Sequence, residues 1–339
     1  MKTNELTIFN LNNIEPKPVE WLVEPIIPIG KVTTIFGNPG SGKTSLTIKL
    51  AADASNGIFQ LGTLNKKLGQ PINTLLLSAE DGIADTIVPR LMANNANLSK
   101  ISAITAPINL ADYQFESAIV ANNIKLVIID PIQNYLGYNL DMNKANHIRP
   151  FMQHLADIAE KNNCAIILVG HLNKGNSSAL YKALGSIDFI AATRSSLIVS
   201  SAPNDPNVRI IAQTKNSLAR LSSSVAFIIK DHSEIEWIDY QNISADELVK
   251  TEKYSNSKFE TAKEIILFEL ASGEKSYSEM EAIAKANNIG IRTFKEAKKA
   301  LGVIPIKHPN YWGWKLPSTD NFPLASLPSS IDESNSNIK

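Results

Sequence analysis

Residues 37–44 read Gly-Asn-Pro-Gly-Ser-Gly-Lys-Thr, which fits the pattern G-x-x-x-x-G-K-S/T. The apolar run before them, residues 31–36, is rich in β-branched side chains and predicts a buried strand. The residues that follow predict a helix, which Asn56 and Gly57 end. A glycine-rich loop between a strand and a helix binds phosphate through backbone N–H groups and the lysine. We therefore expect a nucleotide-binding loop made of Gly37, Asn38, Pro39, Gly40, Ser41, Gly42, Lys43, Thr44 and Ser45.

The pattern of apolar runs predicts an α/β fold with a mostly parallel sheet. Three further short runs predict buried strands, at residues 74–77, 126–129 and 165–169. Helical periodicity over residues 148–161 connects the last two. Continuous apolar strands that alternate with helices indicate a parallel sheet covered on both faces. Later runs without a long helix between them predict antiparallel strands added to one side, at residues 197–201, 208–214 and 225–229.

A polar side chain follows each of these three strands, at the edge where an open α/β sheet binds its ligand. Asp130 ends the second run, and we expect it to hold Mg²⁺ together with Thr44. Glu80 follows the first run and is the candidate base for the attacking water, while Asp81 is expected to cap a helix. His171 follows the third run and is expected to sense a γ-phosphate, with a structural histidine as the alternative.

Together, the segments GNPGSGKT, LLLSAED, LVIIDP and VGHLNK resemble those of RecA-like ATPases. More narrowly, they are similar to plasmid RepA-type hexameric replicative helicases and their AAA family relatives from phages and mobile elements. The resemblance covers roughly residues 20–230 and implies a RecA-like P-loop NTPase core that binds ATP and Mg²⁺. The residues with implied roles are Lys43, Glu80 and His171 in catalysis and Thr44 and Asp130 in metal binding.

Two further stretches imply cations that act on the nucleotide of a neighbouring subunit. Residues 183–194 are similar to the family's Gly-Ser stretch that leads to an arginine finger, which makes Arg194 the candidate. Residues 213–216 are similar to a Lys-Asn element with the same role, which adds Lys215. Arg220 is a further candidate that can share this work. Exposed cations at strand ends, without any such role, are the alternative.

The resemblance also implies partners. It points to a homo-oligomer, expected to be a hexameric ring, that acts on DNA with a primase or initiator protein. Loops at residues 134–146 and 173–186 combine lysines with tyrosines such as Tyr135, which suits single-stranded DNA in a ring pore; solvated loops are the alternative. The expected role is a replicative helicase or related DNA-remodelling ATPase. An ATP-switched DNA-binding regulator and a RecA- or RadA-type recombination mediator remain alternatives.

The chain is expected to contain five segments. They are an N-terminal extension at 1–20, the ATPase domain at 21–240, a linker at 241–258, a winged-helix-like domain at 259–317 and a disordered tail at 318–339. The third helix of the winged-helix-like domain, at 291–301, carries Arg292, Lys295, Lys298 and Lys299. It predicts DNA binding, with a solvated helix or a protein contact as alternatives. Trp312 and Trp314 are expected to pack in the core of this domain.

Composition limits the remaining possibilities. Hydrophobic residues make up 44% and charged residues 19% of the chain, as in ordinary folded proteins. Lys plus Arg (33) equals Asp plus Glu (33), so DNA binding has to be local. The N-terminus lacks a secretory apolar core, and no segment has the roughly 20 apolar residues of a membrane span. We therefore expect a cytoplasmic protein without a membrane partner, with Cys164 as a buried thiol.

Overall fold

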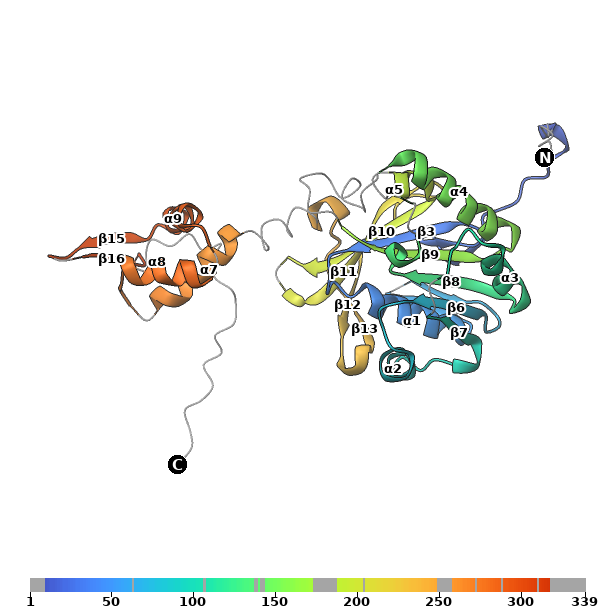
Figure 1. Ribbon diagram of the computed structural model, residues 1–339, viewed down its shortest axis with the longest axis horizontal. Coiled ribbons are helices and arrows are strands. Elements are labelled where there is room, and N and C mark those ends of the chain that lie inside the picture. The colour runs from blue at the N-terminus through green and yellow to red at the C-terminus, as the bar shows by residue number, and fades with distance from the viewer. Residues whose placement is uncertain are drawn as a thin grey trace, which may run out of the picture. The chain divides into compact units, whose positions relative to one another are not determined.

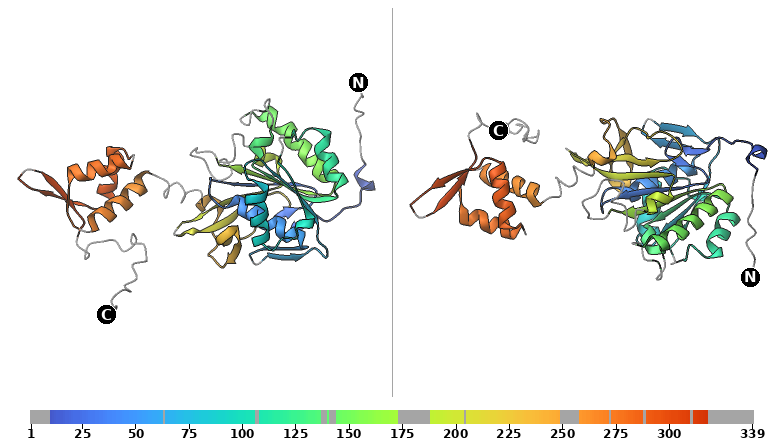
Figure 2. Two further views of the ribbon diagram at one scale, coloured as in Figure 1. Left: turned by 60° about the horizontal axis from the view of Figure 1, so that its bottom comes forward. Right: turned by 90° about the horizontal axis from the view of Figure 1, so that it is seen from above.

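The computed structural model describes residues 10–62, 64–105, 108–136, 140, 144–172, 188–203, 205–248, 258–271, 273–287, 289–309 and 311–317. The chain divides into two compact units, Met1–Glu252 and Lys253–Lys339 (Figures 1 and 2). The first unit extends past the boundary expected at residue 240, because Ile243, Ala245 and Leu248 are buried in its core. Part of the expected linker therefore belongs to the N-terminal unit.

A mixed sheet of nine strands, counted over the described residues, forms the centre of the N-terminal unit in the order β13-β12-β11-β10-β3-β9-β8-β6-β7. Six neighbouring strands are parallel: β3 (Val32–Gly37), β6 (Asn73–Ser78), β7 (Ile101–Ile104), β8 (Ile124–Asp130), β9 (Ala165–His171) and β10 (Ser195–Ala202). Three antiparallel strands follow β10: β11 (Asp205–Asn216), β12 (Val225–Ile229) and β13 (Ile235–Ile238). The mostly parallel α/β sheet is confirmed.

The direction of β10 differs from the prediction. We expected the run at residues 197–201 to begin the antiparallel part, but β10 is parallel to β3, and only β11 and β12 have the expected direction. A helix, α5 (Asp188–Ala192), precedes β10. Five residues are too few to produce a recognisable helical period, so no local pattern indicates a crossover before this strand.

Helices cover both faces of the sheet, as the continuous apolar strands predict. On one face lie α1 (Lys43–Ser55) and α2 (Val88–Ala93), and on the other α3 (Tyr113–Ala121), α4 (Ala145–Lys161) and α5 (Figure 1). Side chains of β3 alternate between the two layers, because Ile35 packs in the cluster of α1 and Phe36 in the cluster of α4. Cys164 is buried beside β9, and burial raises the pKa of its thiol to about 11.

Short strands complete the N-terminal unit. They pair as two hairpins, β1 (Trp21–Val23) with β2 (Ile27–Pro28) and β4 (Ile58–Leu61) with β5 (Leu64–Lys67). None of these four strands was predicted, nor were β7 and β13 at the two sheet edges. Strands of two to four residues do not contain enough alternation to be distinguished from loops.

The C-terminal unit contains three helices and a small antiparallel sheet within its described residues. The helices are α7 (Lys258–Ala271), α8 (Tyr277–Ala286) and α9 (Ile291–Ala300), and the strands are β14 (Lys275–Ser276), β15 (Ile304–Lys307) and β16 (Trp312–Lys315). The sheet order is β14-β16-β15. Ile266, Met280, Phe294 and Trp314 are among the residues of a separate core. This unit therefore has a core of its own.

Candidate active site

The predicted nucleotide-binding loop connects β3 to α1, and three of its glycines are required by geometry. A Cβ atom on Gly37 would lie 2.3 Å from the backbone oxygen of Val199 in β10. Gly40 and Gly42 have φ angles of 74° and 94°, in the left-handed region that favours glycine. These residues let the chain turn tightly from the strand into the helix, so that backbone N–H groups remain accessible for phosphate.

Lys43 and Ser41 supply polar side chains to this loop. Lys43 is only 6% exposed, and its Nζ donates hydrogen bonds to the backbone oxygens of Gly37 (2.9 Å) and Asn38 (2.8 Å). The Oγ of Ser41 is buried and has no hydrogen-bond partner among the described residues. A buried hydroxyl is normally satisfied, and a phosphate oxygen is a group that can satisfy this one. The loop therefore fits a polyphosphate.

Thr44 and Asp130 meet at the carboxyl ends of the parallel strands. The Oγ1 of Thr44 donates a hydrogen bond of 2.8 Å to Oδ2 of Asp130. Magnesium prefers oxygen ligands and is usually held by one or two protein groups together with substrate phosphates. In the described part of the chain, no three His, Cys, Asp or Glu side chains are grouped to hold a metal by themselves. Thr44 and Asp130 therefore fit the Mg²⁺ of a bound nucleotide.

The electrostatics around Asp130 favour a bound cation. Burial raises the pKa of Asp130, and the negative charges of Glu80 and Asp81 raise it further. The hydrogen bond from Thr44 and the charge of Lys43 oppose these effects. A divalent cation would stabilise the ionised carboxylates in this region, because it would offset both the burial of Asp130 and their mutual repulsion.

Glu80, the predicted base, lies just after β6 and is exposed. Its Oε1 accepts a hydrogen bond of 3.3 Å from Nδ2 of Asn134, a residue that the sequence analysis did not single out. Glu80 is near enough to Asp130 for its charge to affect the pKa of that residue. A carboxylate that is open to water and oriented by an amide suits a general base.

Asp81 does not cap a helix, contrary to our expectation. Gly82 takes the N-cap position, and the helical segment begins with a π-helical turn at Ile83–Ile87. Because the helix starts after Gly82, the carboxylate of Asp81 does not bond its first N–H groups. Its Oδ2 instead pairs with Nη1 of Arg90 in α2, at 2.9 Å.

His171 lies beside the first residue of the loop. The parallel register of β3 and β9 pairs His171 with Gly37. The Nδ1 atom of His171 is buried and has no hydrogen-bond partner among the described residues. The imidazole is therefore next to the site expected to hold the phosphates. The following segment, residues 173–186, which we expected to contact DNA, lies outside the described residues.

The first two residues of the other loop that we expected to contact DNA, at residues 134–146, belong to a turn instead. Tyr135 is only 1% exposed and belongs to a 3₁₀ turn, Ile132–Tyr135, that packs into the core. Burial raises the pKa of its hydroxyl to about 12. Tyr135 therefore cannot stack on a DNA base, because its ring already packs against the protein. Lys144 is exposed, and residues 137–139 and 141–143 lie outside the described residues.

Arg194 lies at the amino ends of the parallel strands, whereas the nucleotide-binding loop lies at their carboxyl ends. It precedes β10, whose first residue, Ser195, pairs in parallel with Thr33 near the start of β3. The loop begins at Gly37, at the other end of β3. A strand rises about 3.3 Å per residue, so Thr33 and Gly37 are about 13 Å apart along β3. Arg194 is exposed, and a contact with nucleotide would need another subunit.

Lys215 lies at the same end of the strands and is hydrogen-bonded within its own chain. Its Nζ donates hydrogen bonds of 2.8 Å to the backbone oxygens of both Ile190 and Ala191, in α5. Burial lowers the pKa of Lys215, and the charge of Arg194 lowers it further. Arg220 is exposed beyond the end of β11. Lys215 would have to leave these carbonyls to reach a neighbouring nucleotide.

Arg209 is a cation near the loop that sequence reasoning missed. Its Cγ lies 3.5 Å from the position that a Cβ on Gly42 would occupy. Nη1 donates to the backbone oxygen of Pro206, while Nε is buried without a partner among the described residues. Burial lowers the pKa of Arg209, and Asp205 opposes this effect. Arg209 can therefore add positive charge to the nucleotide site of its own chain.

These groups define the site of a P-loop NTPase of the α/β class. A family model described as an AAA domain matches residues 2–177, and the chain belongs to this family. The match includes the loop, Glu80, Asp130 and His171, and it ends before Arg194. The family is one of ATPases, for which ATP and Mg²⁺ are the expected ligands. No curated protein matches the chain. Among the described residues, no helix is long and apolar enough to cross a membrane.

Proposed function

We propose that the chain is an ATP-hydrolysing DNA motor: a RepA-type replicative helicase, or a related DNA-remodelling ATPase of a plasmid, phage or mobile element. It acts in the cytoplasm as a homo-oligomer, a hexameric ring around single-stranded DNA. ATP binds at the loop with Mg²⁺ on Thr44 and Asp130, Glu80 activates the attacking water, and His171 responds to the γ-phosphate.

The observation that carries this proposal is the position of Arg194. Arg194 is exposed at the amino ends of the parallel strands, opposite its own loop, and the part-buried Lys215 lies at the same end. Cations at that end can complete the site of a neighbouring subunit but not their own. A cation at the γ-phosphate stabilises the charge of the transition state, so assembly would switch on hydrolysis. This arrangement suits a ring whose subunits hydrolyse ATP in turn.

The C-terminal unit supports the choice of DNA as the partner. Its three helices are followed by the strands β15 and β16, which is the order of a winged helix-turn-helix, and we propose that it has this fold. The exposed side of α9 carries Arg292, Lys295 and Lys299. The same basic helix favours one second candidate, an ATP-switched DNA-binding regulator.

An unwinding assay tests the motor. With ATP and Mg²⁺, the purified protein should displace a labelled strand from a duplex that carries a single-stranded tail. Lys43→Ala should displace none, because it lacks the cation that contacts the outer phosphates. ATP-dependent binding to duplex without displacement would support the regulator instead. Strand exchange between homologous molecules would support a recombination mediator, and either result would contradict the motor.

A further inference from the structure

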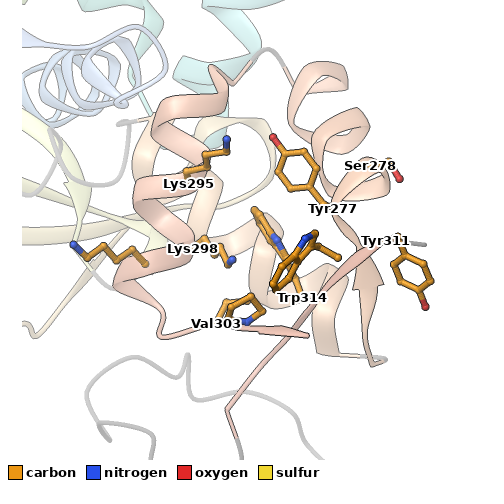
Figure 3. A pocket seen from close by; sticks show the side chains of 10 residues that line it. Tyr277, Ser278, Lys295, Lys298, Val303, Tyr311 and Trp314 are labelled. Atoms are coloured by element: carbon orange, nitrogen blue, oxygen red, sulfur yellow. The ribbon is translucent and has the colours of Figure 1, made fainter. Parts of the chain in front are cut away.

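A groove of about 730 Å³ opens on the C-terminal unit between α8, α9 and the β15–β16 hairpin. Figure 3 shows Lys295 and Lys298 reaching from α9 toward Tyr277 and Trp314. The volume is within the range of sites that bind small molecules or single residues of a polymer. All of its lining residues belong to the C-terminal unit, which therefore forms the groove by itself.

The charge of the groove is positive. Lys295, Lys298 and Lys299 all line it, and none of its lining residues is acidic. Lys298 and Lys299 follow Lys295 by three and four residues, so the three lysines are neighbours on the surface of α9, and Lys298 also adjoins the buried Phe294. Among the described residues, none of the three lysines forms a salt bridge. They remain available for an anionic ligand.

Two of these lysines lie over aromatic rings that form the wall of the groove. Lys298 Nζ is 4.6 Å from the ring centre of Trp314, and Lys295 Nζ is 5.3 Å from that of Tyr277. Trp314 is only 3% exposed and stacks on Phe294, so it belongs to the core as expected. Burial lowers the pKa of Lys298, and the charge of Lys295 lowers it further. An anion in the groove would reduce this repulsion.

Trp312 differs from the expectation that both tryptophans pack in the core. It is 51% exposed at the start of β16, and the neighbouring Tyr311 is 49% exposed. Both residues line the groove. Side chains of a strand alternate between its faces, so Trp312 and Trp314 share one face of β16. Trp314 pairs with both β14 and β15, whereas Trp312 pairs with β15 alone and lies beyond the end of β14, which leaves it exposed. A large exposed ring beside lysines that form no salt bridge among the described residues offers a surface on which a planar group can stack.

We propose that this groove binds a single strand of nucleic acid, with phosphates at Lys295 and Lys299 and an unpaired base on Trp312. Stacking needs the face of a base, which a duplex covers with neighbouring base pairs, so an unpaired strand fits better than a duplex. An acidic peptide would satisfy the lysines but would offer no comparable planar group at each anionic residue. This inference depends on the proposed function only in identifying DNA as the nucleic acid that the groove binds.

Binding by the full chain tests the groove. Without ATP, a fluorescent oligothymidine of about 12 nucleotides should bind Trp312→Ala about tenfold more weakly, which corresponds to the loss of one stacked base. Trp312→Phe should recover most of the affinity. Phe268→Ala, which removes a ring that is 80% exposed on α7 outside the groove, should not change it. Hydrolysis without DNA should be the same in all four proteins.

Salt dependence and crosslinking locate the contacts. Lys295→Ala with Lys299→Ala should reduce the slope of log affinity against log salt by about 1.4, because two phosphate contacts are lost. Lys285→Ala, outside the groove, should leave the slope unchanged. Light-induced crosslinks from 5-iodouracil in the strand should map to Tyr311 or Trp312.

Three results would overturn the proposal. They are unchanged affinity in Trp312→Ala, tighter binding of a hairpin duplex with the same number of phosphates, and equal competition by an acidic peptide of the same charge. If the proposed motor function is wrong but the groove proposal is right, strand displacement would be absent while the groove still bound oligothymidine. Conversely, a motor without this site would unwind DNA while Trp312→Ala bound the strand normally.

Discussion

Arg194→Ala should lower ATP turnover of the assembled protein by about 10³-fold while ATP binding remains close to normal. The reason is the position of Arg194 at the end of the strands opposite its own loop, from which, under the proposed function, it acts on the nucleotide of a neighbouring subunit. The loop, Thr44 and Asp130 are unchanged in this variant, so the ground-state contacts with ATP persist. Steady-state hydrolysis and binding of a fluorescent ATP analogue measure the two quantities.

Mixing variants tests whether the site is shared. Arg194→Ala supplies intact Glu80, and Glu80→Gln supplies intact Arg194, so a mixed assembly contains some junctions with both groups. Mixtures should therefore recover part of the activity that each variant lacks alone. Arg220→Ala tests whether this second exposed candidate shares the work, and turnover close to that of the unchanged protein would leave the role to Arg194. A mixture that stays inactive at every ratio would show that Arg194 does not act on a neighbour.

Glu80→Gln should reduce turnover by about 10²- to 10⁴-fold, the usual contribution of a general base. The substitution keeps the shape of the side chain, and its amide oxygen can still accept the hydrogen bond from Asn134. The variant should therefore bind ATP and Mg²⁺ but fail to activate water. Single-turnover hydrolysis of ATP preloaded on the protein separates this chemical step from binding and product release.

Asp81→Asn is the matched control for this prediction. Asp81 is adjacent in sequence, but its Oδ2 is paired with Nη1 of Arg90 and is therefore directed at the guanidinium rather than at a water molecule. The pair is partly open to solvent, so its loss should cost little stability and the protein should remain folded. We expect a much smaller loss of turnover than in Glu80→Gln. A loss in Asp81→Asn equal to that in Glu80→Gln would mean that the two carboxylates share the task.

The polar ends of the central strands could be predicted from the sequence. β3, β6, β8 and β9 are continuous apolar runs, and such runs are typical of parallel strands buried on both faces. If these strands are parallel, the residues that follow them lie together at the carboxyl ends of the strands. The structure brings Thr44 to Asp130 and His171 to Gly37 in this way.

Features that depend on distant pairing could not be predicted. Arg209 approaches Gly42 only because β11 folds back along β10, and no local pattern indicates this contact. Tyr135 looked like a loop residue, but its turn packs into the core. Asp81 was predicted to cap a helix because Asp is common at N-cap positions. The helix begins one residue later, with Gly82 as its N-cap, and Asp81 pairs with Arg90 instead.

The most direct test of the account is ATP hydrolysis by the purified protein with and without single-stranded DNA, beside Lys43→Ala. We expect hydrolysis that single-stranded DNA stimulates several-fold, and we expect neither basal nor stimulated activity in the variant. Hydrolysis that depends on Lys43 but does not respond to single-stranded DNA would contradict the DNA motor.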